Sequence, residues 1–166
     1  MKIVISDTSP INYLVLIGKQ DILPALFERI IVPQSVVREL SAAAAPHSVR
    51  RWIAAPPSWL EIREPAKSPG PELFLLGEGE RDAIQLAEEL KADLLVMDER
   101  AGREEALKRG LPVIGTLGIV EQAAERGLLD FAVMLADLKA HNFFISSALE
   151  DDFLARDAQR KSKADS

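Results

Sequence analysis

The first ten residues, MKIVISDTSP (residues 1–10), run from an apolar, strand-like stretch directly into Asp7. Two interpretations of this carboxylate are open. Asp, Thr and Ser are good helix N-caps and Pro10 suits a first helical turn, so Asp7 could serve only as a cap. Alternatively, the strand positions Asp7 for chemistry at its carboxyl end. The rest of the chain bears on this choice.

Short apolar segments of the same kind recur along the chain and alternate with helical patterns. The predicted strands are Lys2–Ser6, Arg29–Val32, Trp59–Arg63, Leu94–Met97 and Pro112–Ile114. The predicted helices are Pro10–Ile17, Asp21–Phe27, Gln34–Ala44, 47–55, Glu80–Leu90, Glu99–Arg109, Leu117–Arg126, 130–140 and 147–160. Such alternation predicts an α/β fold with a parallel sheet covered on both faces. In these sheets ligands bind outside the carboxyl ends of the strands.

Length and composition narrow the class of protein. The 166 residues fit one domain, which we expect over residues 1–160, with a frayed tail over 161–166. No apolar run is long enough for a membrane span, the N-terminus lacks a signal-peptide pattern, and there is no cysteine, so we expect a cytoplasmic protein. The net charge of −6 argues against a broad nucleic-acid surface. Any contact with nucleic acid would therefore depend on a local patch or on bound cations.

Four acidic residues stand where they could meet at one edge of the sheet. Asp7 and Asp98 each close a predicted strand, in IVISD and LLVMD, while Glu39 lies in SVVRELS and Glu80 closes GEGE. Taken singly, Glu80 is typical of a helix-dipole partner and Glu39 of a solvent-exposed position. Clustered carboxylates repel, however, and the usual reason for such a cluster is a hard cation such as Mg²⁺ or Mn²⁺.

Other metal and catalytic sites have little support. The two histidines, His47 and His141, lie far apart and on no ligand motif, and the chain has no cysteine. Zinc catalysis and a Ser-His-Asp triad are therefore disfavoured.

Four motifs in order resemble those of PIN-domain proteins. They are ISDTSPINYL, VPQSVVREL, LGEGERDAIQLAEE and LLVMDERAGREEALKRGLPVIGTLGIVEQAAERGLL, and the resemblance covers roughly residues 1–130. The chain is most similar to a prokaryotic subfamily related to VapC-type ribonuclease toxins. The resemblance implies a three-layer α/β sandwich with a central parallel sheet of order 3-2-1-4-5. This order would make Asp7 and Asp98 neighbours.

The resemblance also implies roles for the acids. Asp7, Glu39, Glu80 and Asp98 would be the catalytic, metal-binding residues. Glu80 stands where most PIN domains carry Asp, and its extra methylene would let it reach the metal through water. Asp82 is the rival for this position, and the spacing to the following apolar helix residues favours Glu80.

Four further side chains are candidate substrate ligands. Thr8 or Ser9 could hydrogen-bond Asp7 or the water shell of the metal. Arg100 and Arg103 could hold a phosphodiester, and the alternative for them is an exposed helix face with neighbouring glutamates. The apolar run 143–145 is interpreted as a core or homodimer contact rather than a base-stacking platform.

The leading functional hypothesis is a metal-dependent endoribonuclease that hydrolyses RNA. The resemblance implies the toxin of a toxin–antitoxin pair, with a small antitoxin protein as partner. One alternative is a non-catalytic PIN-like binding or assembly module. The other is an aspartyl-phosphate phosphatase with Asp7 as nucleophile, although position 9 is Ser rather than the second aspartate which that chemistry uses, and no suitable lysine follows.

Overall fold

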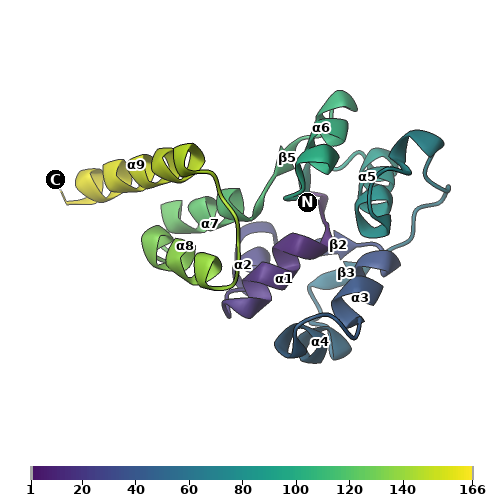
Figure 1. Ribbon diagram of the computed structural model, residues 1–166, viewed down its shortest axis with the longest axis horizontal. Coiled ribbons are helices and arrows are strands. Elements are labelled where there is room, and N and C mark those ends of the chain that lie inside the picture. The colour runs from purple at the N-terminus through teal and green to yellow at the C-terminus, as the bar shows by residue number, and fades with distance from the viewer. Residues whose placement is uncertain (1, 166) are drawn as a thin grey trace. The chain divides into compact units, whose positions relative to one another are not determined.

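A parallel five-stranded sheet forms the centre of the computed structural model, which describes residues 2–165 (Figure 1). The strands are β1 (Val4–Ser6), β2 (Ile30–Val32), β3 (Leu60–Ile62), β4 (Leu94–Val96) and β5 (Val113–Ile114). Their order is β3-β2-β1-β4-β5, and Ile5 pairs with Ile31 on one side and Leu95 on the other. The predicted parallel sheet of order 3-2-1-4-5 is confirmed.

Each strand is shorter than predicted, but its neighbours in the chain continue the pairing. The amide of Asp93 donates to the carbonyl of Ile3 at 2.8 Å, and the amide of Asp7 donates to the carbonyl of Val96 at 2.9 Å. The second of these bonds lies one residue beyond β1. Asp7 is therefore held against β4 by the backbone.

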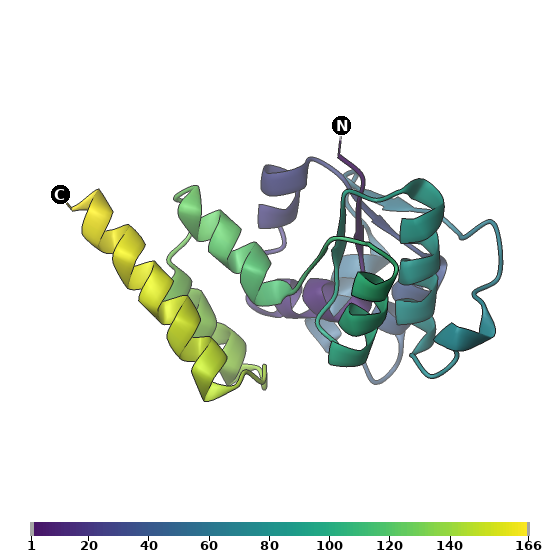
Figure 2. The same ribbon diagram turned by 90° about the horizontal axis from the view of Figure 1, so that it is seen from above.

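Helices follow the strands, and those before residue 116 flank the sheet (Figure 2). The helical elements are α1 (Thr8–Leu16), α2 (Ile22–Phe27), α3 (Gln34–Ser41), α4 (His47–Ala54), the 3₁₀ turn η1 (Pro71–Leu73), α5 (Glu78–Leu90), α6 (Arg100–Lys108), α7 (Thr116–Glu125), α8 (Phe131–Ala140) and α9 (Ser147–Ala164). Helix α5 begins two residues before its predicted start, so Glu80 lies in its first turn. The turn η1 was not predicted, because its segment is rich in Pro and Gly and has the composition of a loop.

An apolar cluster joins the sheet to α5 and α6. Ile5 of β1, Leu95 of β4 and Ile84 of α5 are fully buried in it, together with Ala106 of α6. Leu73 of η1 is buried in the same cluster. These strands are covered by apolar side chains, as their uninterrupted apolar sequences predict.

The chain divides into two compact units, one ending at Thr116 and the other beginning at Leu117. In the second unit the rings of Phe131 and Phe153 stack with centroids 5.5 Å apart. The prediction of a single domain over residues 1–160 stays a prediction.

Helix α9 continues to Ala164. The frayed tail over residues 161–166 stays a prediction, and Ser166 lies outside the described residues. The ammonium group of Lys161 lies 2.9 Å from a carboxylate oxygen of Asp157 and 3.1 Å from one of Asp130. These pairs hold the last turns of the helix. Among the described residues, no helix is both long and apolar enough to cross a membrane.

Candidate active site

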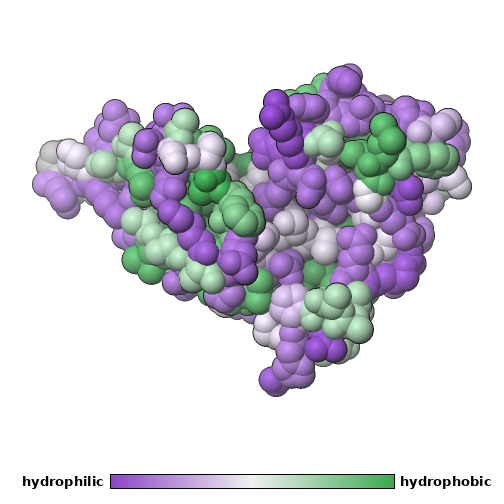
Figure 3. All heavy atoms as spheres, in the orientation of Figure 1, coloured by the Kyte–Doolittle hydropathy of each residue, from purple (hydrophilic) through white to green (hydrophobic). Residues whose placement is uncertain are grey.

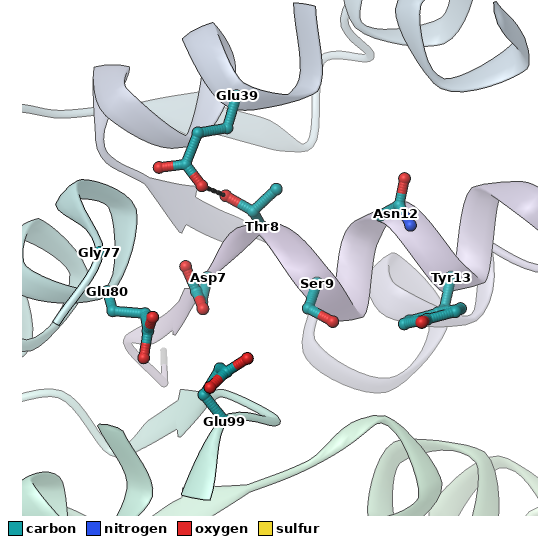
Figure 4. Close-up of a pocket in the computed structure, with 9 residues that line it drawn as sticks. All are labelled: Asp7, Thr8, Ser9, Asn12, Tyr13, Glu39, Gly77, Glu80 and Glu99. Atoms are coloured by element: carbon teal, nitrogen blue, oxygen red, sulfur yellow. Dashed lines mark hydrogen bonds between the residues drawn. The ribbon is translucent and has the colours of Figure 1, made fainter. Parts of the chain in front are cut away.

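Asp7 lies at the carboxyl end of β1, where the chain turns into α1 (Figure 4). It occupies the N-cap position of α1 with extended backbone, yet its side chain makes no capping hydrogen bond. The residue is only 3% exposed, and its Oδ1 atom has no hydrogen-bond partner. A cap would use that oxygen, so the structure does not support capping as the reason for an acid here.

The surroundings of Asp7 favour its neutral form. Burial raises the pKa of the Asp7 carboxyl from its ordinary value of 3.8 to about 7. The charges of Glu80, Glu39 and Asp98 contribute to this raised pKa, while a hydrogen bond from the backbone of Thr8 opposes the rise. A carboxyl group in this state is poised to bind a cation, which would restore the charged form.

Glu80 faces Asp7 from the first turn of α5 (Figure 4). Its Oε2 atom is buried without a hydrogen-bond partner. Burial and the charge of Glu99 raise the pKa of Glu80, and a backbone hydrogen bond from Gly77 opposes them. Asp82, the rival candidate, does not line the pocket that Glu80 lines.

Glu39 connects the starts of two other helices. Its Oε1 atom accepts a hydrogen bond from the Thr8 hydroxyl at 2.8 Å (Figure 4). Its Oε2 atom accepts one from the Gly79 amide at 2.8 Å. A Cβ atom added at Gly79 would lie 2.5 Å from Oε2. A side chain at this position would therefore displace the Glu39 carboxylate from the Gly79 amide.

Asp98 follows β4 but does not line the pocket. Its two carboxylate oxygens accept hydrogen bonds from the amide and the hydroxyl of Thr116, both at 2.7 Å. Thr116 is the first residue of α7, so Asp98 stabilises the start of that helix. The next residue, Glu99, lies in the pocket instead.

The pocket has a volume of about 310 Å³. It is lined by Asp7, Thr8, Ser9, Asn12, Tyr13, Glu39, Gly77, Glu80 and Glu99. Carboxylates gather at one end, around Asp7 (Figure 4). Uncharged polar side chains of α1, those of Ser9, Asn12 and Tyr13, form the other end (Figure 4).

Sequence reasoning missed four of these residues, namely Asn12, Tyr13, Gly77 and Glu99. Ser9, Asn12 and Tyr13 have the spacing i, i+3 and i+4, which places side chains on one face of a helix. That spacing, counted from the predicted residue Ser9, could have revealed Asn12 and Tyr13. Nothing in the sequence signals that Glu99 rather than Asp98 enters the pocket.

A family model described as the PIN domain matches residues 3–159. The chain belongs to the PIN-domain family. This confirms the family that the sequence motifs resemble. PIN-domain proteins are in general nucleases, a class of hydrolases, and generally use divalent metal ions. No curated protein matches the chain.

The donor set of this PIN domain suits a hard divalent ion. Asp7 and Glu80 each present a buried carboxylate oxygen without a partner, and oxygen is the ligand that Mg²⁺ and Mn²⁺ prefer. As the side chains stand, no three His, Asp or Glu residues within 2–165 are close enough together to hold a metal ion. Hydrogen bonds already occupy the carboxylates of Glu39 and Asp98. Movement of side chains would have to accompany metal binding.

The two candidate arginines lie outside the pocket lining. Arg100 is exposed and pairs with Glu104 at 3.0 Å, as an ordinary helix face would. Arg103 is half-buried, and its Nη1 atom donates to the carbonyl of Met97 at 3.4 Å. Of the other two predicted substrate ligands, Thr8 binds Glu39 rather than Asp7, and Ser9 lines the pocket. Their roles toward substrate stay predictions.

Proposed function

We propose that this PIN-domain protein is an endoribonuclease that hydrolyses RNA phosphodiesters with Mg²⁺ or Mn²⁺. One observation carries the proposal: the buried carboxyl of Asp7, whose pKa is raised to about 7 and whose Oδ1 has no partner, at the carboxyl edge of a parallel sheet. Burying a carboxyl group without a partner is costly. A cation bound there would remove this cost.

Asp7 and Glu80 would hold the ion directly, because each has a free buried oxygen. Glu99 lines the same end of the pocket and would add negative charge. When bound, the ion supplies activation of a water molecule and stabilises charge on the phosphodiester.

The other residues of the chain orient the site. Glu39 holds the first turn of α5, and therefore Glu80, beside the start of α1. Ser9 and Asn12 offer neutral hydrogen-bonding groups to the anionic substrate. The charge of Asp98 raises the pKa of Asp7, and the hydrogen bond that Asp98 accepts from Thr116 holds the start of α7.

Cleavage of a labelled single-stranded RNA tests this proposal. We expect cleavage with Mg²⁺ or Mn²⁺ and none in EDTA. Asp7→Asn should lower the rate by at least about 100-fold with an unchanged circular dichroism spectrum, since a direct ligand matters at least as much as its supporting partners. Asp151→Asn, at an exposed position of α9, is the matched control and should retain the full rate. Undiminished cleavage in EDTA or by Asp7→Asn would contradict the mechanism.

A non-catalytic binding module is the second candidate. The observation that favours it is the absence, among the residues that the structure describes, of three acids placed to hold an ion as they stand. Under this alternative the protein would bind Mn²⁺ or RNA but would release no product. The same assay, joined to a measurement of RNA binding, separates the two.

We also propose that the nuclease acts as the toxin of a toxin–antitoxin pair. Support comes from the ordered motifs, which resemble those of VapC-related proteins. Expression in a bacterial host should arrest growth, and co-expression of the small protein encoded by the neighbouring gene should relieve the arrest. Asp7→Asn should be harmless. Growth arrest by that variant would argue against toxicity through RNA cleavage.

A further inference from the structure

An exposed apolar segment lies next to the pocket in the chain. Phe74 and Leu75 follow η1 and are 60% and 98% exposed. Figure 3 shows hydrophobic atoms gathered at the upper right, where Figure 1 draws the segment before α5. Gly77, which lines the pocket, is three residues beyond Phe74, so their Cα atoms are at most about 11 Å apart. The segment that carries this ring therefore leads directly into the lining of the pocket.

A cation accompanies this ring. The guanidinium carbon of Arg81 lies 5.7 Å from the centroid of Phe74. Arg81 directly follows Glu80 in α5. Apart from its contact with the ring, Arg81 forms no ion pair with any carboxylate within residues 2–165. Its positive charge is therefore available to an anion.

The acidic neighbours of the segment are paired with other arginines. Glu72 lies 3.0 Å from Arg109, and Glu78 lies 2.6 Å from Arg38. These pairs reduce the negative charge on either side of Phe74. An RNA strand approaching the ring would thus meet an aromatic face and a cation, although the chain as a whole has a net charge of −6.

We propose that Phe74 and Arg81 form a stacking platform for one nucleobase of a single-stranded RNA whose phosphodiester enters the pocket. This inference rests on the proposed ribonuclease function. Bases stack on aromatic side chains without strong sequence preference, and arginine adds a cation–π contribution. Because an acidic protein gains little from non-specific attraction to phosphate, stacking would supply a large share of its affinity for RNA.

Binding to a defined RNA tests the platform independently of cleavage. The probes are a fluorescein-labelled oligouridylate and the same sugar–phosphate chain without bases, both measured with Mg²⁺ in an Asp7→Asn background. Adding Phe74→Ala should weaken binding of oligouridylate roughly 5- to 150-fold, the range for loss of one stacked base. Phe74→Trp should keep or strengthen binding.

Two controls make the result specific. Phe144→Ala removes a phenylalanine that is 93% exposed in the second unit, and it should leave binding unchanged. The chain without bases should bind with the same affinity whether Phe74 is present or replaced by alanine. Arg81→Ala should weaken the binding of both probes, because its charge acts on phosphate as well as on the ring.

Kinetics separate failure of the platform from failure of the proposed function. With Asp7 intact, Phe74→Ala should raise KM by a similar factor and leave kcat nearly unchanged. If the wild type cleaves RNA but Phe74→Ala changes neither Kd nor KM, the platform is wrong and the patch serves another contact, such as a protein partner. If Phe74→Ala weakens binding but the wild type never cleaves RNA, the reaction is wrong and the platform stands.

Discussion

At the scale of single residues, the Asp7 carboxyl links the stability of this protein to pH. Its pKa is about 7 in the native protein and 3.8 ordinarily, because burial disfavours the charged form. The native state therefore holds this proton more tightly than the unfolded chain does. This tighter binding contributes to the free energy of unfolding. The contribution is fully present below the pKa that Asp7 has in the unfolded chain, and it is lost as the pH rises through the pKa that Asp7 has in the native protein.

The first prediction concerns Asp7→Asn in EDTA. Asparagine has nearly the same shape and no charge to bury, so the variant should melt at a higher temperature than the wild type at about pH 8. The difference should narrow towards about pH 4, where the wild-type carboxyl is protonated. Thermal melts across this range provide the measurement. A variant that is less stable at every pH would indicate that the carboxylate has a favourable partner.

The second prediction compares two neighbouring acids of α5. Glu80→Gln should lower RNA cleavage by at least about tenfold, because it removes the charge of an oxygen buried in the pocket. Asp82→Asn should have a much smaller effect, since its side chain does not line the pocket. Initial rates at saturating Mn²⁺ give the ranking. The opposite order would reassign the third acid of the site to Asp82.

At the scale of secondary-structure elements, Glu39 of α3 joins the starts of α1 and α5. The two hydrogen bonds reach residues 31 and 40 positions away in the chain. They fix the first turn of α5, which carries Glu80. Glu39 therefore orients the site, whether or not it also binds an ion.

The third prediction tests this connection with Gly79→Ala. Alanine is ordinarily better than glycine inside a helix by roughly 0.5–1 kcal/mol. Here its Cβ would lie 2.5 Å from Oε2 of Glu39, so the carboxylate must move and lose its hydrogen bond. Gly79→Ala should therefore lower the free energy of unfolding by about 1 kcal/mol or more. Urea unfolding provides the measurement.

A double-mutant cycle supplies the control for Gly79. In a Glu39→Ala background the obstruction is gone, so Gly79→Ala should become neutral or stabilising there. Equal effects of Gly79→Ala in both backgrounds would show that Glu39 does not explain the glycine.

At the scale of the whole molecule, the proposed binding of a metal ion would be coupled to folding. An ion that binds only the native protein stabilises it by about 2.7 kcal/mol when its concentration is 100 times Kd. Asp7, which directly follows β1, and Glu80, in the first turn of α5, would hold this ion, so the ion would join separate elements.

The fourth prediction is a rise in melting temperature when Mn²⁺ is added to the metal-free protein. The rise should shrink strongly in Asp7→Asn and persist in Asp151→Asn, which lies on an exposed face of α9. Differential scanning calorimetry with and without Mn²⁺ gives the shift for each of the three proteins. Shifts of equal size in the wild type and in Asp7→Asn would show that the ion binds elsewhere.

The sequence alone was sufficient for the class of the fold and for the central acid of the site. Apolar strands that alternate with amphipathic helices can bury their side chains only in a covered parallel sheet, and the motifs supplied its strand order. Asp7 could be predicted because it closes such a strand. Glu80 could be preferred over Asp82 because helical spacing is a local property.

Tertiary structure alone decided how the other acids are used. Asp98 accepts hydrogen bonds from Thr116, whereas Glu99 lines the pocket. Glu39 accepts hydrogen bonds from Thr8 and Gly79. These hydrogen bonds join residues 18 to 40 positions apart, and no local pattern specifies them. The pKa of Asp7 is likewise raised mainly by burial, which arises only when distant segments pack around it and exclude water.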